Sequence, residues 1–237
     1  MHVHHFDRLT GRYRFTLARL HTDWHAHPVT ELLWTPAGNL EVATEGEQHT
    51  GIQLAIIPAN LTHRVYCATG PVSVLLLDLL TPVIQHLLSI ASPPHPQSVY
   101  LASTNTYPVD PLPSLLEAVH DHPHPSLSDP LVRAAVERLR RTALPTAAAL
   151  TQLAREAHLS ESRFSHRFKA AAGISLRQYL VWCRLNRAFE RVLTGACNLG
   201  EAALQSGFHD AAHLSKAFRQ YLGLSPSTVY NSRTVQG

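Results

Sequence analysis

Cysteine is scarce in this sequence: Cys67, Cys183 and Cys197 are the three thiols among 237 residues. So few cysteines, so widely spaced, exclude a disulfide framework and suit a reducing compartment. For Cys67 a redox role and burial as a small apolar side chain are both open, and burial is the favoured interpretation. No apolar run approaches the roughly 20 residues of a membrane-spanning helix. The first residues also lack the apolar core of a signal peptide, so we expect a cytoplasmic protein with no membrane association.

Lysine is absent from the first 129 residues. This part contains five Arg against eleven Asp and Glu, a net charge of −6 with His neutral, whereas residues 130–237 contain fifteen Lys and Arg against six acidic residues, a net charge of +9. A basic half joined to an acidic half favours nucleic-acid binding by the basic half.

Short apolar segments separated by Gly, Pro, Asn and polar turns fill residues 12–80. Their length of four to eight residues and their spacing of about ten predict a β-sandwich or a small β-barrel. From residue 82 the pattern changes to helical spacing, and a Pro-rich stretch follows. For the expected helix 82–91, dimerisation and core packing are equally open. We therefore expect a barrel domain over 1–80 and a helical, Pro-rich connector over 81–129.

Residues 130–237 read as helical throughout, and residues 146–230 contain an internal repeat. The pattern F-x4-G-[Ile/Leu]-Ser begins at Phe168 and again at Phe218, fifty residues later. Ala154 and Leu159 match Ala203 and Phe208 at an offset of forty-nine, so the second copy has one more residue in its turn. Each copy reads as helix, tight turn, helix, which is the organisation of a helix-turn-helix unit whose second helix enters the major groove of DNA.

The second helix of each copy has one apolar face and one polar face. Ser160 and Asp210 are expected N-caps, and Gly173 is an expected C-terminal stop. The polar faces carry groups that can donate to guanine edges or phosphates, and small residues that allow close approach. The candidate DNA-contacting residues are Ser162, Arg163, Ser165, His166 and Lys169 in the first copy, and Ala212, His213, Lys216 and Arg219 in the second, beside Ala211.

A continuous helix over 175–195 is expected between the two copies. Its length of about 30 Å approaches the roughly 34 Å of one DNA turn, so the two reading helices could occupy adjacent major grooves. Its basic side chains are expected to add to the positive field: Arg177, Arg184, Arg187 and Arg191.

The span 146–230 resembles the DNA-binding domain of AraC-family transcription regulators. The motifs that carry the resemblance are LAREAHLSESRFSHRFKAAAGISLRQYL, RLNRAFERVL and GFHDAAHLSKAFRQYLGLSP. The resemblance implies base contacts from positions Ser162, Ser165 and His166, and from Ala212 and Lys216. The small pair Ala211-Ala212 replaces polar residues that are common in the family, so fewer base hydrogen bonds are expected there.

The first eighty residues resemble a cupin barrel, which many AraC-like regulators carry. His25-x-His27-x3-Glu31-x6-Gly38 matches the first cupin motif without its leading glycine, and Pro58-x-Asn60-x2-His63 resembles the second with Asn in place of glycine. The resemblance implies that His25, His27, Glu31 and His63 converge inside the barrel. On a strand, His25 and His27 share a face. Glu31 shares it too if the strand continues, or else a bend redirects it.

Three imidazoles and one carboxylate suit a divalent transition metal: Zn, Fe, Mn, Ni or Co. The histidines within residues 2–5 are better interpreted as part of a solvated terminus, and those within residues 120–125 as part of a solvated linker. The sequence thus predicts a transcription regulator that binds double-stranded DNA, and not an enzyme. We expect a metal, or a small molecule bound to the metal, to control DNA binding. A homodimer is possible. Two alternatives stay open: a metal-free organic-effector pocket in the same regulator, and a metal-dependent cupin enzyme, for which the helical repeat would have no role.

Overall fold

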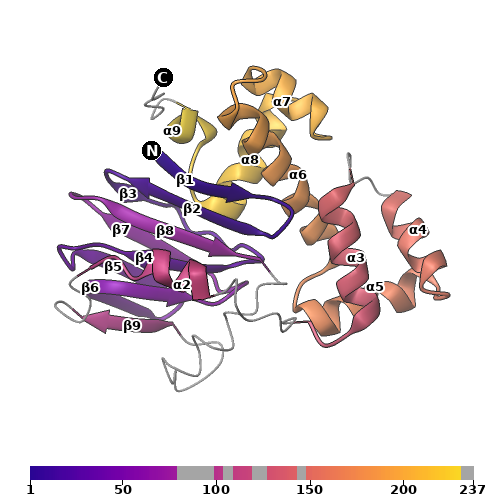
Figure 1. Ribbon diagram of the computed structural model, residues 1–237, viewed down its shortest axis with the longest axis horizontal. Coiled ribbons are helices and arrows are strands. Elements are labelled where there is room, and N and C mark those ends of the chain that lie inside the picture. Colours follow the sequence, from indigo (N-terminus) through magenta and orange to yellow (C-terminus); the bar gives the residue numbers. More distant parts are fainter. Residues whose placement is uncertain (79–98, 104–108, 119–126, 143–147, 231–237) are drawn as a thin grey trace. The chain divides into compact units, whose positions relative to one another are not determined.

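The protein, described by a computed structural model, divides into two compact units (Figure 1). The structure describes residues 1–78, 99–103, 109–118, 127–142 and 148–230. One unit comprises Met1–Ser126 together with Arg219–Gly237, and the other comprises Leu127–Phe218. The expected helix over 82–91 lies outside the described residues. Among the residues described, no helix combines the length and apolarity that crossing a bilayer requires.

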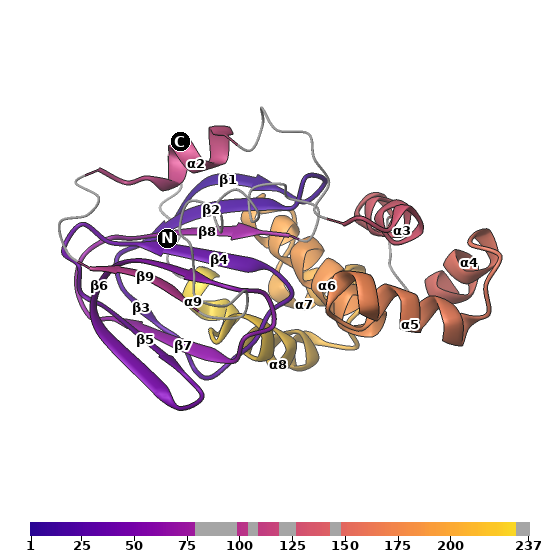
Figure 2. The ribbon, with the colours of Figure 1, turned by 90° about the horizontal axis from the view of Figure 1, so that it is seen from below.

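The first unit is built on one antiparallel sheet, which Figure 2 shows curled into a half-barrel. Its strands follow the order β1-β2-β8-β4-β6-β5-β7-β3, and β9 also pairs with β6. The long strand β6 pairs through its first half with β5 and through its second half with β4 and β9. The strand bounds are β1 His2–Asp7, β2 Arg12–Leu17, β3 Leu20–His21, β4 Thr30–Trp34, β5 Leu40–Thr44, β6 Glu47–Ile57, β7 His63–Cys67, β8 Val72–Leu77 and β9 Tyr100–Ser103.

Side-chain parity separates two faces of the sheet. One apolar cluster gathers residues from β4, β6, β8 and β9 beneath Leu112, the first residue of the short helix α2 (Leu112–Ala118). Leu32 and Trp34 of β4 belong to this cluster, so Glu31, one residue before Leu32, points to the opposite face. There Glu31 is paired in register with Ile57 and Leu76. The alternation in β4 therefore directs one carboxylate into the concavity of the half-barrel.

The apolar segments expected in 12–80 are confirmed as strands β2, β4, β5, β6, β7 and β8, and three strands were not predicted separately: β1, the two-residue β3 and β9. β1 occupies the histidine-rich N-terminus, interpreted from sequence as solvated, and pairs with β2, where His4 Nε2 lies 2.8 Å from Thr16 Oγ1. β9 lies in the stretch interpreted as irregular and connecting, and it pairs with β6. In β1 and β9 the alternation of apolar and polar residues extends over only six and four residues, which is too short to predict a strand from sequence. Each strand depends on hydrogen bonds with its partner strand.

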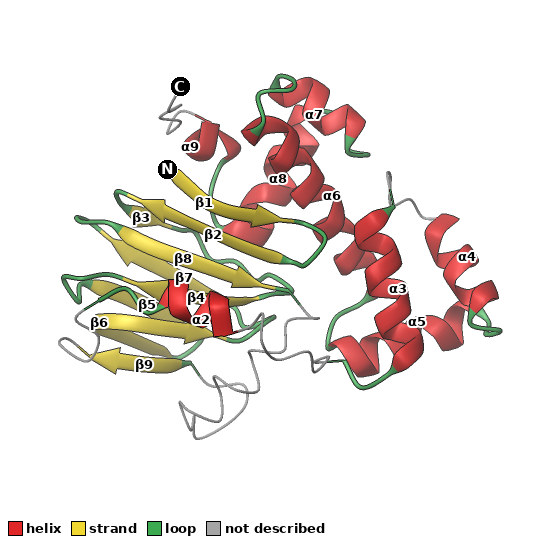
Figure 3. Ribbon diagram, in the orientation of Figure 1, coloured by secondary structure: helices red, strands yellow, loops and turns green. Residues whose placement is uncertain are grey.

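The second unit is helical, and α8 continues beyond it (Figure 3). Asp129 caps α3 by accepting from the N–H groups of Leu131 and Val132. Ser160 caps α5, and Gly173 ends that helix with φ 72°, as expected. The helix bounds are α3 Pro130–Arg141, α4 Ala148–Glu156, α5 Glu161–Ala172, α6 Leu176–Leu193, α7 Leu199–Gln205 and α8 Ala211–Leu222, followed by α9 Pro226–Tyr230.

The repeat corresponds to two helix-turn-helix units, α4–α5 and α7–α8. In the first turn the Leu159 N–H donates to the Ala154 carbonyl, and in the second the Phe208 N–H donates to the Ala203 carbonyl, both at 2.9 Å. The turn requires one residue with positive φ, and this is His158 (φ 53°) in one unit and Gly207 (φ 83°) in the other.

The additional residue of the second turn is His209. It lies between the buried Phe208 and the N-cap Asp210, whose Oδ1 accepts from the His213 N–H at 2.7 Å. In the first unit Ser160 follows Leu159 directly. The insertion accounts for the change in repeat offset from forty-nine to fifty.

Candidate metal centre and DNA interface

Four side chains converge at the concave face of the half-barrel. His25, His27, Glu31 and His63 each place a ligand atom within 4.8 Å of those of the others, and no other such group of three or more His, Cys, Asp or Glu occurs among the described residues. The relative exposures of the four residues are 5, 2, 7 and 0% in that order. The geometric expectation from the sequence, that these four side chains meet, is confirmed.

Backbone contacts hold the two sequence segments of this cluster together. His25 and His63 form an isolated antiparallel bridge, with N–H to carbonyl distances of 3.0 and 2.9 Å. The N–H of Asn60 donates to the His27 carbonyl at 2.8 Å, which closes the loop before β7 onto the first segment. Asn60 has φ 65°, and Asn tolerates this left-handed conformation better than most residues. This explains why Asn can stand where the cupin motif has glycine.

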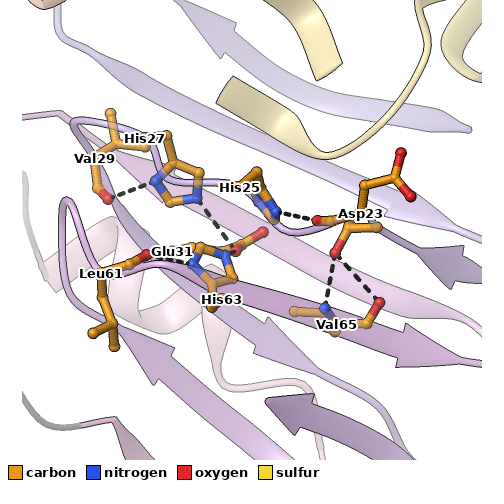
Figure 4. A network of polar contacts seen from close by, with 9 residues as sticks. Asp23, His25, His27, Val29, Glu31, Leu61, His63 and Val65 are labelled. Carbon is orange, nitrogen blue, oxygen red and sulfur yellow. Dashed lines mark hydrogen bonds and ion pairs between the residues drawn. The ribbon is translucent and has the colours of Figure 1, made fainter. Parts of the chain in front are cut away.

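Each imidazole is oriented by a backbone carbonyl close to it in sequence (Figure 4). The Nδ1 atoms of His25, His27 and His63 lie 2.9, 2.9 and 2.8 Å from carbonyl oxygens, and the ring centroids are 4.2 to 5.4 Å apart. Such second contacts fix the tautomer and the ring orientation of metal-binding histidines. The carbonyls belong to Asp23, Val29 and Leu61.

The donor atoms of the cluster favour a cation between them. Because a carbonyl oxygen can only accept, each Nδ1 carries a hydrogen, and a neutral ring then has a lone pair on Nε2. The Nε2 atoms of His27 and His63 lie 3.4 and 3.0 Å from Glu31 Oε2. Lone pairs and a carboxylate repel one another at these distances unless a proton or a metal ion lies between them. This donor set fits a divalent metal.

The electrostatics of two members agree with that arrangement. Burial by itself raises the pKa of Glu31, but hydrogen bonds from His27 and His63, when a proton is on Nε2, outweigh it, so the pKa lies well below its usual value. Burial, reinforced by the positive form of His63, lowers the pKa of His25 to about 3. His25 is therefore a neutral imidazole near pH 7, which is the form that binds metal ions.

Sequence reasoning left open how Glu31 reaches the site, and the structure resolves this. β4 begins at Thr30, and bends at Pro28 and Val29 separate it from His25 and His27. The orienting carbonyls could not be found from sequence, because every residue type supplies one. Cys67 is buried, with its Sγ 3.3 Å from Asn39 Oδ1, and it is not a member of the cluster.

The candidate DNA-contacting residues of the first copy lie on α5. Phe164 and Phe168 are 1 and 0% exposed and pack into the helical unit. Ser165 is half-buried, and the other four candidates are exposed: Ser162, Arg163, His166 and Lys169. The neighbouring Arg167 pairs with Asp129, the cap of α3, at 2.6 Å. The helix therefore presents a polar face opposite its two aromatic residues.

α8 has the same division. Leu214 and Phe218 are 1 and 4% exposed. The His209 N–H donates to His213 Nδ1 at 3.3 Å, so the hydrogen of a neutral His213 ring is on Nε2. Ala211 is half-buried, and the four candidates are exposed: Ala212, His213, Lys216 and Arg219.

The basic side chains of α6 do not all contribute to a positive surface. Arg187 is 8% exposed, and its Nη2 donates to the Arg140 carbonyl in the last turn of α3 at 3.3 Å. A helix C-terminus leaves carbonyl groups without intrahelical partners, so a cation is favourable there. The expectation that Arg187 adds to the surface field is therefore wrong. Arg191 Nη1 donates to Gln205 Oε1 at 2.6 Å, whereas Arg177 is exposed.

A family model described as a helix-turn-helix domain matches residues 153–232. A putative AraC-like transcription regulator from Streptomyces lividans is 28% identical over 182 residues, which are 77% of this chain and 51% of that protein. The transcriptional activator RhaR from Pectobacterium atrosepticum is 36% identical over 76 residues, 32% of this chain and 26% of that protein. The matches thus span from a quarter to about half of these relatives. Their names are those of regulators, not enzymes.

The fold resembles that of a solved structure over most of both chains. ToxT from Vibrio cholerae, described as bound to an unsaturated fatty acid, superposes with a TM-score of 0.57 at 13% identity, over 94% of this chain and 95% of that one. At this identity the likeness concerns the fold alone. The sequence comparisons go further for the helical part: residues 153–232 are similar to the helix-turn-helix domain of DNA-binding transcription regulators, an AraC-like regulator among them.

Proposed function

We propose that this protein is a DNA-binding transcription regulator of the AraC type, that it binds a divalent transition metal through His25, His27, Glu31 and His63, and that the metal controls its affinity for DNA. The observation that carries the proposal is the convergence of three carbonyl-anchored imidazoles on one buried carboxylate. Zn, Fe, Mn, Ni and Co all fit such nitrogen-rich ligation. The bound ion would neutralise the carboxylate and join the segment before β4 to the start of β7. The half-barrel is the cupin-type sensor of this proposal.

Control of DNA binding requires that the metal-bound and metal-free proteins differ in DNA affinity. By linkage, an ion that raises DNA affinity by some factor is itself bound more tightly, by the same factor, in the DNA complex. An ion bound equally well in both states would shift nothing. The control can therefore be measured in two ways, as metal-dependent DNA affinity or as DNA-dependent metal affinity.

Elemental analysis of the protein purified without an affinity tag tests the metal site. We expect close to one equivalent of a transition metal in the wild type and a loss of most of it in His27→Ala and Glu31→Gln. His49→Ala is the matched control, because His49 lies on β6 beside Glu47 and outside the cluster. Equal metal content in all four proteins would refute the metal site. An organic effector would then be the remaining candidate for the sensor.

We further propose that α5 and α8 contact base edges in two adjacent major grooves. In support, α6 has 18 residues, about 27 Å at 1.5 Å per residue, against roughly 34 Å for one DNA turn. Arg163 and Lys216 are exposed on the polar faces and can donate to guanine or to phosphate.

Replacing Arg163 or Lys216 by Ala is expected to weaken binding to a selected duplex by about 1–3 kcal/mol, with relaxed sequence preference at one position. The measurement is titration against the selected duplex and its single-base variants. Arg155→Ala, an exposed arginine of α4, is the control. Uniform weakening on all sequences, with a shallower salt dependence, would reassign the side chain to phosphate contact. No change in either variant would contradict a role in DNA binding.

A further inference from the structure

A hollow of about 660 Å³ opens on the helical unit beside α6. It is lined by Ser165, His166 and Lys169 of α5 and by His213 of α8, and thus by candidate reading residues of both copies. The α6 residues that line it include Arg177, Val181 and Arg184, which recur at i, i+4 and i+7 and therefore share one helix face. The two arginines are about 10.5 Å apart along the helix axis, at 1.5 Å per residue.

The lining of this hollow combines basic and apolar side chains. Lys169, Arg177 and Arg184 contribute cations, whereas Leu176, Leu180 and Val181 contribute apolar surface, and none of its described lining residues is acidic. Arg184 is half-buried, and burial lowers the pKa of its guanidinium, since the charged form loses hydration there. An anion in the hollow would offset this cost.

If α5 and α8 occupy two successive major grooves, the minor groove between them and its two flanking backbones face the part of the protein between the two helices. This part is α6, because residues of α5, α6 and α8 line the same hollow. Phosphates match the basic side chains of the lining, and the carbon faces of the deoxyriboses match its apolar side chains. A duplex held by both reading helices also occupies the space in front of the hollow, which leaves little room for another ligand.

We propose that Arg177 and Arg184 of α6, together with Lys169, seat the sugar–phosphate backbone of the DNA between the two major-groove contacts. α6 is then a DNA-binding element that supplies sequence-independent affinity, in addition to setting the distance between the reading helices. This inference rests on the proposed reading role of α5 and α8.

The test is the dependence of DNA affinity on salt for Arg177→Gln, Arg184→Gln and the double variant. Each neutralised phosphate contributes about 0.9 to the slope of log K against log salt concentration, so the slope is expected to become shallower by about 0.9 in each single variant and about 1.8 in the double variant. The ratio of affinities for selected and unrelated duplexes should stay the same. Ethylation of individual phosphates in the segment between the two half-sites should interfere with binding by the wild type but not by the double variant.

Arg155→Gln is the matched control, because Arg155 is an exposed arginine of the same unit that does not line the hollow. It should leave the slope and the interference pattern unchanged. Arg177 is exposed, so Arg177→Gln decides the question even if Arg184→Gln fails to fold.

This inference would be overturned if the salt slope of Arg177→Gln equalled that of the control while the wild type still distinguished its selected duplex. The proposed reading role of α5 and α8 would not be affected. A wild type that distinguishes no duplex would overturn both. A third outcome would also overturn this inference. The wild type would bind decanoate, the α6 variants would not, and the salt dependence of DNA binding by these variants would equal that of the wild type. The hollow would then be a site for an amphipathic carboxylate.

Discussion

At the scale of single residues, two residues that each have two structural roles help to position the candidate functional side chains. Asn60 adopts φ 65° and donates its N–H to the His27 carbonyl, so one residue both turns the chain and joins the two ligand segments. Asp129 likewise has two roles. It caps α3 and pairs with Arg167 on α5, the proposed first reading helix.

Asp129 makes stability depend on pH. Burial by itself raises the pKa of its carboxyl, but hydrogen bonds from Arg167 and from the N–H groups of Leu131 and Val132 outweigh it and lower the pKa from 3.8. Because the folded pKa is depressed, the carboxylate stabilises the fold above about pH 4 and this contribution is lost as the pH falls through the folded pKa.

Asp129→Ala is expected to lower the free energy of unfolding at pH 7 by about 1 kcal/mol for the cap, with up to about 1 kcal/mol more for the partly exposed ion pair. Asp129→Asn should lose only the ion pair, since Asn also caps helices well. Denaturant unfolding at pH 7 and at pH 2.5 measures both differences. The difference between wild type and Asp129→Asn should shrink at the lower pH. A difference that grows there would contradict the role given to the charge.

At the scale of elements, the two helix-turn-helix units meet one geometric requirement with different residues. Both turns place a residue with positive φ before the buried residue that closes the turn, and this residue is His158 in one unit and Gly207 in the other. His209 lengthens only the second turn, next to the N-cap of α8. The units are therefore related in architecture but not identical in the way α5 and α8 begin.

Gly207→Ala should destabilise the second helix-turn-helix unit. A side chain at φ 83° costs roughly 1–2 kcal/mol, and the smaller entropy of the unfolded chain offsets part of this, so a net loss of about 1 kcal/mol is expected. His158→Gly, the reciprocal change at the matching position, relieves the same strain and should cause little or no loss. Thermal unfolding of both variants measures the contrast. Equal destabilisation by the two substitutions would show that φ is not the cause.

At the scale of the whole molecule, the chain combines an acidic half-barrel that carries the histidine cluster with a basic helical part that carries the repeat. A ligand that binds only the folded half-barrel stabilises it by mass action, whatever it does to the helical unit. The effect of a metal should therefore be local in the strands that carry the ligands, and measurable without knowledge of the operator.

Chelation of the metal is expected to destabilise the half-barrel selectively. An ion at 100 times its Kd adds about 2.7 kcal/mol to the free energy of unfolding, so its removal should lower that quantity correspondingly. Hydrogen exchange should become faster in β4 and β7 on treatment with a chelator and slow again when the ion is restored, with α3 and α6 as internal references. The same treatment of Glu31→Gln should have little effect. Equal acceleration in that variant would place the metal elsewhere.

Much of the fold could be predicted from local patterns. Strand spacing, helix caps and the repeat depend on residues close together in sequence, so Ser160, Gly173 and Asp210 were identified correctly as helix ends. β9 was missed because its partner β6 is more than forty residues away. Arg187 was misplaced on the surface because nothing local distinguishes an exposed arginine from one that reaches the end of a neighbouring helix.

The sequence by itself determined the run of short strands, the helical repeat, the polar faces of α5 and α8 and the identity of the four clustered side chains, because each depends on residue type and on short-range periodicity. Only the tertiary structure decided how those side chains converge, since the bend before β4, the His25–His63 bridge and the orienting carbonyls belong to backbone geometry. It also decided which arginines of α6 remain at the surface. Contacts between distant segments, rather than any local pattern, set both outcomes.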